Sequence, residues 1–357
     1  MTERDAALTR ALELAGQGGL ATDFTRLTAE EAADICRDLY GMEGTLDRLD
    51  TEKDDTFRLT TDQGRFILKV ANPDEAESEL DLQLAALRHL EETGFPIDVP
   101  RAVPLQAGGY IARLAGSDRL VRMMTYVEGE MVEDAGLDAN QRYHYGRALA
   151  ELRLALAAFS HPAQGRVLAW DVRHAGILRP LLTQIDTTPE RVALAEAVFD
   201  RLAALQPRID ALPRQVVHND FRGNNLVGDP ATPQFITGII DFGDVVETAV
   251  AIDLSTAVMN QMLRDFPPEA DIFAPSRAVV EGYAAHAPIG EEELAMVPHL
   301  VMARVLLRAV MNEWRAALMP NNREYILRNS GPSWGQLAWF ITRPVEEISA
   351  LLLPCPT

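Results

Sequence analysis

Residues 215–244 read QVVHNDFRGNNLVGDPATPQFITGIIDFGD, and the rest of the chain is organised around this stretch. It contains two short apolar segments, Val216–Val217 and Phe235–Ile240, which are typical of buried strands. Each segment ends in polar residues that an ordinary core strand does not carry. We therefore expect both strands to deliver side chains to a functional site.

The polar residues follow a spacing with a known chemical use. His218, Asp220 and Asn225 form H-x-D-x-x-x-x-N after the first segment, and Asp241 opens the tripeptide D-F-G after the second. In kinases, the first aspartate takes or orients the proton of the acceptor hydroxyl, while the asparagine and the D-F-G aspartate hold magnesium against the nucleotide phosphates. Either motif alone also fits a structural turn or another metal site. Their order and their placement after two strands favour phosphoryl transfer.

Length and composition describe a globular chain. It has 357 residues, nearly half of them apolar, which is enough for two lobes with a sizeable core. No segment approaches the roughly 18 consecutive apolar residues of a membrane helix, and the charged N-terminus lacks the apolar core of a signal peptide. We expect a cytoplasmic protein with no membrane partner.

The charge balance excludes one class of partner. The chain carries 53 acidic and 33 basic residues, a formal net charge of −20, whereas binding to duplex nucleic acid needs a basic surface. This acidity is compatible with a cationic small substrate, although it more often only keeps a surface soluble. Cys36 and Cys355 form neither a disulfide framework nor a zinc-ligand spacing. The oligomeric state is not specified, and a homodimer remains open.

The N-terminal part changes from helical to strand periodicity. Residues 3–16 have helical spacing, and Thr28 with Glu31 forms a capping box for a second helix that ends at Gly41. A third helix is expected over residues 75–93. Strands are expected over residues 45–50, 56–61, 65–71, 109–114 and 120–127. These strands predict an antiparallel five-stranded sheet.

Lys69 lies inside the third expected strand, in the apolar run 66–70. It is either a charge that protects a sheet edge from aggregation or the strand lysine that contacts nucleotide phosphates. The motifs further along the chain favour the phosphate role. The helix that follows should supply an acidic partner for Lys69, with Asp81 as first choice and Glu79 as second.

A hinge is expected where Glu128-Gly129 interrupts the last strand. The edge of a nucleotide base would hydrogen-bond to main chain near Met124 and Tyr126, although a plain linker between lobes gives the same pattern. The sequence thus predicts an α+β, two-lobed, protein-kinase-like fold. Residues 1–126 form a small antiparallel-sheet lobe, and residues 127–357 form a larger, mainly helical lobe.

The helical lobe contains ionisable residues on apolar faces. Its clearest helical segments are residues 137–160, 188–205, 249–263 and 291–318. Asp253 lies in the third, needs a partner because a buried unpaired carboxylate is costly, and should support the catalytic loop. Arg304 and Arg308 are four residues apart on one face of the fourth. They fit a structural ion pair with a carboxylate or, for Arg304 in particular, a contact with the carboxylate of a substrate.

Taken in order, these features resemble the aminoglycoside phosphotransferase and choline kinase superfamily, and within it hydroxylysine kinase-like small-molecule kinases. The similarity extends from about residue 20 to about residue 340. The H-x-D-x-x-x-x-N and D-F-G-D motifs are its most specific parts. The matching segments are Tyr40-Gly41, Phe66–Val70, Leu80–Gln83, Thr125–Gly129, Leu168–Asp171, His218–Leu226 and Gly238–Asp244.

The resemblance implies a role for each of five residues. Asp220 would be the catalytic base, and Asn225 and Asp241 the magnesium ligands. Lys69 would anchor the phosphates of the nucleotide. Asp244 falls on an acidic position of the family and would bind substrate or a second magnesium ion.

Two further positions concern the backbone of the catalytic loop. His218 braces this loop in such kinases, which implies a supporting role and not that of the base. Asn219 departs from the family, which usually has glycine between the histidine and the aspartate. This departure affects the local backbone without removing a reacting group.

The resemblance also implies the substrates. ATP or GTP would donate the γ-phosphate in the presence of Mg²⁺, and the acceptor would be a small amino alcohol or hydroxy amino acid similar to hydroxylysine. Homoserine, choline and aminoglycosides remain alternative acceptors. A nucleotide-binding pseudokinase or scaffold is the main rival function. A metal-dependent hydrolase using His218, Asp220 and Asp241 would need further ligands at close spacing, and the sequence offers none that is convincing.

Overall fold

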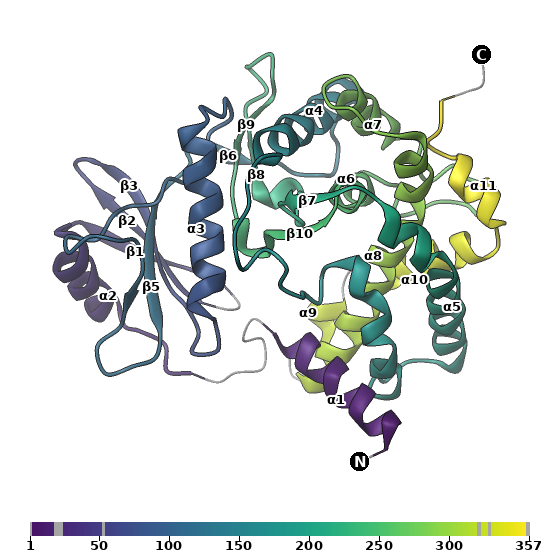
Figure 1. The fold of residues 1–357 in the computed structure, drawn as a ribbon, viewed down its shortest axis with the longest axis horizontal. Helices are drawn as coiled ribbons and strands as arrows, with labels where there is room; N and C mark the ends of the chain where they lie inside the picture. Colours follow the sequence, from purple (N-terminus) through teal and green to yellow (C-terminus); the bar gives the residue numbers. More distant parts are fainter. Residues whose placement is uncertain (1, 18–23, 52–53, 320–322, 328–329, 355–357) are drawn as a thin grey trace.

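The N-terminal lobe is built on the expected antiparallel five-stranded sheet (Figure 1). The structure, a computed structural model, describes residues 2–17, 24–51, 54–319, 323–327 and 330–354. The strand order is β1-β2-β3-β5-β4, and all neighbouring pairs are antiparallel. The strands are β1 (Thr45–Leu49), β2 (Asp55–Thr61), β3 (Gly64–Val70), β4 (Ala112–Arg113) and β5 (Leu120–Thr125).

The two faces of this sheet carry different side chains because residues alternate along each strand. Leu68 is fully buried on the face that packs against α2 (Ala29–Ile35) and the π-helical turn η1 (Cys36–Tyr40). Lys69 therefore points to the opposite face. The helix α3 (Glu77–Glu92) lies between this face and the second lobe (Figure 1).

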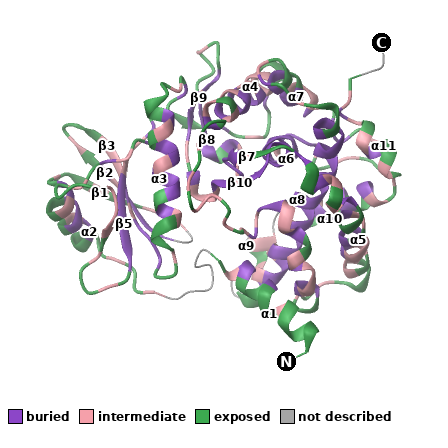
Figure 2. Ribbon diagram, viewed as in Figure 1, coloured by how far each residue is buried: buried purple, intermediate pink, exposed green. Residues whose placement is uncertain are grey.

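The C-terminal lobe is mainly helical and surrounds one long buried helix. This helix is α8 (Glu291–Leu318), and 94% of its most apolar 18-residue segment is buried (Figure 2). It is long and apolar enough to cross a membrane, but its burial shows that core packing accounts for this composition. The other helices are α4 (Ala139–Leu156), η2 (Val172–Thr183), α5 (Pro189–Ala211), α6 (Val250–Asn260), α7 (Arg277–Ala284), α9 (Arg323–Leu327), α10 (Ser330–Ile341) and α11 (Val345–Ala350).

Five short strands form two small sheets next to the first lobe (Figure 1). One sheet has the order β6-β8-β9 and the other pairs β10 with β7. Both apolar segments of the central stretch lie in these sheets. The strands are β6 (Glu130–Met131), β7 (Arg214–Val217), β8 (Leu226–Gly228), β9 (Ile236–Ile239) and β10 (Val246–Ala249).

The N-terminal helix α1 (Glu3–Gly16) corrects the predicted lobe boundary. Its buried residues Ala11, Leu14 and Ala15 join the core of the helical lobe, and the helix packs against η2 (Figure 1). The expected division at residue 126 placed this helix with the sheet. The apolar face of α1 is instead covered by C-terminal helices, so the chain starts in one lobe and then crosses to the other.

Helices α4 and α7 pack so closely that a glycine of each helix lies against the backbone of the other. A Cβ atom added to Gly146 would lie 1.9 Å from the carbonyl oxygen of Val279, and one added to Gly282 would lie 1.9 Å from that of Tyr143. Real Cβ atoms do not approach other atoms this closely, so the close packing of the two helices requires glycine at both positions. The contact holds α7 against the helix that lies behind the catalytic loop.

Candidate active site

Strand pairing brings the two polar loops together. In the antiparallel pair β8–β9, Leu226 lies opposite Ile239, and the N–H of Ile240 donates to the carbonyl of Asn225 at 2.8 Å. Asn225 therefore lies beside the residues that lead into Asp241. The chain then returns through β10, which pairs with β7, so the catalytic loop and the metal loop lie together.

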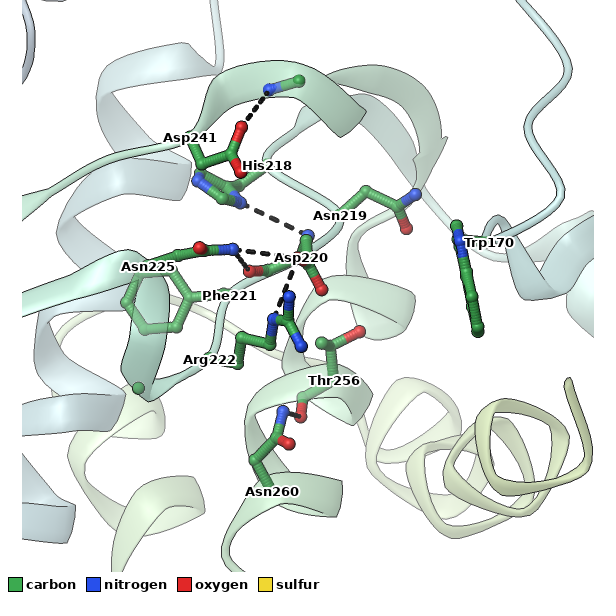
Figure 3. A network of polar contacts seen from close by, with 12 residues as sticks. Trp170, His218, Asn219, Asp220, Phe221, Arg222, Asn225, Asp241, Thr256 and Asn260 are labelled. Atoms are coloured by element: carbon green, nitrogen blue, oxygen red, sulfur yellow. Dashed lines mark hydrogen bonds and ion pairs between the residues drawn. The ribbon is translucent and has the colours of Figure 1, made fainter. Parts of the chain in front are cut away.

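The Asp220 carboxylate is held by three side chains, and Figure 3 shows two of them, Arg222 and Asn225. Arg304 contacts Oδ1 at 3.1 Å, Arg222 contacts Oδ2 at 3.0 Å, and the amide of Asn225 donates to Oδ2 at 2.8 Å. The side chain is nevertheless 18% exposed. Because a carboxylate has about four lone-pair sites, it can accept a further hydrogen bond from a substrate hydroxyl.

Arg304 is a buried partner of the catalytic loop. Its guanidinium donates to the carbonyl of Asn219 at 2.9 Å and to that of Trp170, in addition to the Asp220 carboxylate. Of the two sequence-based interpretations, the structure therefore shows the ion pair. The contact between Arg304 and the carboxylate of a substrate stays a prediction.

His218 and Asp253 brace the backbone around Asp220. One ring nitrogen of His218 faces the N–H of Asp220 at 3.2 Å, and the other contacts the carbonyl of Ile240 at 3.0 Å. Asp253 accepts the N–H groups of His218 and Asn219 at 3.2 and 2.9 Å. Burial raises the pKa of Asp253, and these hydrogen bonds act in the opposite direction. The imidazole thus links the catalytic loop to the start of the metal loop.

The side chains at the metal loop offer oxygen donors. Asp241 is exposed at a φ of 61° and its Oδ1 accepts the N–H of Gly243 at 3.3 Å. Asp244 ends the short 3-10 turn η4 (Phe242–Asp244). The NH₂ group of Asn225 is directed to Asp220, so its Oδ1 is the atom that can face a metal. In the described part of the chain, three or more His, Cys, Asp or Glu side chains do not gather into a metal-binding cluster.

Neither predicted acidic partner reaches Lys69. Asp81 contacts the His161 ring at 3.1 Å, and Glu79 pairs with Arg166 at 3.2 Å. Within residues 2–17, 24–51, 54–319, 323–327 and 330–354, the structure shows no ion pair of Lys69 with either acid. The expectation that Asp81 orients Lys69 is thus wrong for this structure, because both acids point towards the helical lobe.

An amide side chain of α3 reaches the sheet next to Lys69. Gln83 is 5% exposed and accepts from Arg122 at 3.2 Å. Arg122 is the register partner of Lys69 in β5, so the two side chains share one face of the sheet. Sequence reasoning missed both residues. The available signal was an arginine in an apolar strand opposite the lysine.

Arg166 was also missed, although it connects both lobes to the metal loop. Its guanidinium donates to the carbonyls of Gly243 and Val245 and pairs with Glu79 of α3. Only 8% of the Arg166 side chain is exposed. A lone arginine in a connecting segment gave no sequence signal, since all its partners are distant along the chain.

Asn219 adopts a left-handed backbone conformation. This conformation favours glycine, which the family that the chain resembles usually has at this position. The φ of Asn219 is 64°, and its side chain is fully buried beside Asp220. Neither Oδ1 nor Nδ2 has a hydrogen-bond partner among the described residues (Figure 3). Asparagine tolerates the left-handed region better than most residues, so the loop keeps its shape.

At the hinge, fewer main-chain N–H groups than expected are available to hydrogen-bond a nucleotide base. Tyr126 uses its N–H to bond the carbonyl of Arg65 at 2.9 Å, and Thr125 uses its own to bond that of Arg101. Met124 is half-buried in β5 on the face that carries Lys69. A nucleotide base at this hinge would therefore need carbonyl groups or a neighbouring N–H.

Comparison with known proteins agrees with this geometry. The sequence model of a protein family described as the phosphotransferase enzyme family matches residues 20–289, which include Lys69 and both loops. The chain belongs to this phosphotransferase enzyme family. It is a small-molecule kinase with the two-lobed fold of that family.

Relatives of this phosphotransferase act on different small acceptors. Hydroxylysine kinase of Danio rerio is 24% identical over 320 residues, covering 85% of this chain and 88% of the relative. Homoserine kinase of Beijerinckia indica subsp. indica is 30% identical over 256 residues, covering 70% and 72%. A solved structure of the microcompartment-associated aminopropanol kinase has a TM-score of 0.71 at 21% identity and covers 88% of this chain and 98% of its own. That structural similarity shows the fold.

Proposed function

We propose that this phosphotransferase transfers the γ-phosphoryl group of ATP or GTP to the hydroxyl of a small amino alcohol or hydroxy amino acid. The observation that carries this proposal is the Asp220 carboxylate, fixed by Arg304, Arg222 and Asn225 and still partly exposed. Such a group can orient a hydroxyl for in-line attack. The names of the relatives support the acceptor class, and a cytoplasmic location accords with small soluble substrates.

Asp220 would act mainly by positioning the acceptor. Two guanidinium groups and an amide hold its carboxylate in one orientation. A largely dissociative transition state does not require a strong base. The free lone pairs of the carboxylate would hold the hydroxyl oxygen in line and receive its proton late in the transfer.

The phosphate end of the site would be assembled from both lobes. Asn225 and Asp241 would hold Mg²⁺, with Asp244 beside them, and their hard oxygen atoms fit this ion. When bound, Mg²⁺ would neutralise negative charge on the phosphate oxygens. Lys69 would contact the phosphates from β3, where no described side chain forms an ion pair with it. The remaining metal ligands would be phosphate oxygens and water.

The proposal is tested by replacing Asp220. We expect Asp220→Ala to lower phosphotransfer by about 10²- to 10⁴-fold, the usual contribution of a positioned acid–base group. A screen of small hydroxylated amines and amino acids with ATP and with GTP, monitored by nucleotide consumption, provides the activity. Asp62→Ala, at an exposed residue of the β2–β3 turn, is the matched control and should keep wild-type turnover.

Full turnover in Asp220→Ala would exclude this mechanism. Nucleotide binding without transfer to any acceptor would instead support a pseudokinase. Asp241→Asn separates the two further, because it should lower turnover and raise the Mg²⁺ concentration needed for half-maximal rate.

A further inference from the structure

Two arginines, Arg304 and Arg222, pair with Asp220, and two further arginines lie near them. Arg308 is one helical turn after Arg304 on α8, about 6 Å along the helix axis. Arg264 follows the end of α6 and is exposed. It lies close enough to influence both Arg308 and Asp134 electrostatically. Four cations, with Arg222 included, thus surround one region of a chain whose net charge is −20.

Arg308 differs from Arg304 in its partners. Arg304 forms an ion pair with Asp220, whereas the side-chain partners of Arg308 are neutral, the hydroxyl of Ser333 at 3.0 Å and the amide oxygen of Gln336 at 2.9 Å. Among the described residues, no carboxylate forms an ion pair with Arg308. Burial lowers the pKa of Arg308 to about 10, and the positive charges of Arg264 and Arg304 act in the same direction.

The acids of this region do not balance these cations. Asp220 is shared by Arg304 and Arg222. Asp134 accepts the amide of Gln261 at 2.8 Å and the N–H of Gly223, and burial raises its pKa. A partly buried guanidinium without a carboxylate is costly unless an anion occupies the site when the protein works.

We propose that the acceptor carries a carboxylate, which binds Arg308 and Arg264 while its hydroxyl lies at Asp220. This inference rests on the proposed function and selects hydroxy acids, including hydroxy amino acids, over amino alcohols. The separation of about one helical turn between the two arginines of α8 suits an acceptor whose hydroxyl and carboxylate are several bonds apart. Asp134 would remain available to a positively charged amino group.

The experiment compares acceptors that differ only by a carboxyl group. Homoserine is paired with 3-aminopropan-1-ol, and hydroxylysine with the diamine that remains after its decarboxylation. We expect kcat/KM for the acid to exceed that for the amine by about 10- to 100-fold, the range of a hydrogen bond to a charged group. If another acceptor proves better, it is compared with its own decarboxylated counterpart.

Variants assign this preference to the arginines. In Arg308→Gln and Arg264→Gln, the ratio of kcat/KM for acid over amine should fall at least about tenfold, mainly through KM of the acid. Arg264 makes no described hydrogen bond, so its variant should fold even if loss of the Arg308 contacts to α10 impairs folding. Arg208→Gln removes an exposed arginine that pairs with Glu292, and this matched control should keep the wild-type ratio.

Each outcome bears on this inference separately from the proposed function. An amine that is used as well as its acid would overturn the inference while leaving the kinase activity intact. So would an unchanged ratio in both variants. Absence of Asp220-dependent transfer to every acceptor would instead remove the proposed function.

Discussion

His299 shows what one buried side chain contributes at the residue scale. It lies fully buried in α8, and burial lowers its pKa to about 4. The unfolded chain protonates this imidazole near pH 6.5, whereas the folded protein keeps it neutral down to about pH 4. Stability should therefore fall as the pH drops through this window, by roughly 2 kcal/mol between pH 6.5 and pH 5.

Urea unfolding at pH 7, 6 and 5 tests this expectation. In His299→Gln the part of the pH dependence due to His299 should disappear, whatever the variant costs at pH 7. Buried acids such as Asp253, whose pKa is raised by burial, act in the opposite direction and are common to both proteins. Parallel pH profiles for wild type and variant would therefore contradict the assignment.

At the scale of elements, the α4–α7 contact depends on two glycines. Gly282→Ala would place a methyl group 1.9 Å from the carbonyl oxygen of Tyr143, so the helices must separate. We expect a loss of about 1–3 kcal/mol or more in the free energy of unfolding, measured by urea denaturation. Gly335→Ala in α10, where a Cβ atom meets nothing within 4 Å, should be neutral or stabilising by up to about 1 kcal/mol. Equal effects of the two substitutions would refute the packing argument.

At the scale of the whole molecule, Arg166 makes one of the contacts between the two lobes. Glu79→Gln removes only its bond to α3, which is partly exposed and contributes about 0–1 kcal/mol, so KM for nucleotide should rise at most about fivefold. Arg166→Gln also removes the bonds to the metal-loop carbonyls, and kcat should fall about 10- to 100-fold with a higher Mg²⁺ requirement.

Steady-state kinetics across nucleotide and Mg²⁺ concentrations separates these effects. Glu77→Gln is the matched control, because Glu77 is exposed on the same helix and pairs with Arg113. Wild-type kinetics in Arg166→Gln would show that the metal loop holds its shape without this contact.

Features with local signals were predictable. The capping box of Thr28 and Glu31 and the limits of α8 follow from spacing within a few residues, and the structure contains both. The sheet follows from its strand-length apolar segments. The two polar loops were identified because each follows a strand, and strand pairing then places Asn225 beside Asp241.

Features set by distant contacts were not predictable. Sequence spacing placed Glu79, Asp81 and Gln83 on one helix, but the packing of α3 decides that Gln83 faces the sheet and the acids face the other lobe. The lobe that covers α1 likewise depends on residues some 160 positions away, beginning at Val172. Both outcomes depend on how the whole chain packs, and this information is not contained in a short segment of sequence.

The three bonds of Arg166 also determine what persists between turnovers. Its bonds to Gly243 and Val245 lie within one lobe, and only its contact with Glu79 crosses to the other. A separation of the lobes would break the Glu79 contact and leave the two carbonyl bonds in place. The metal loop would then keep its conformation in an open site, and its ordering entropy would not be lost again with each new nucleotide.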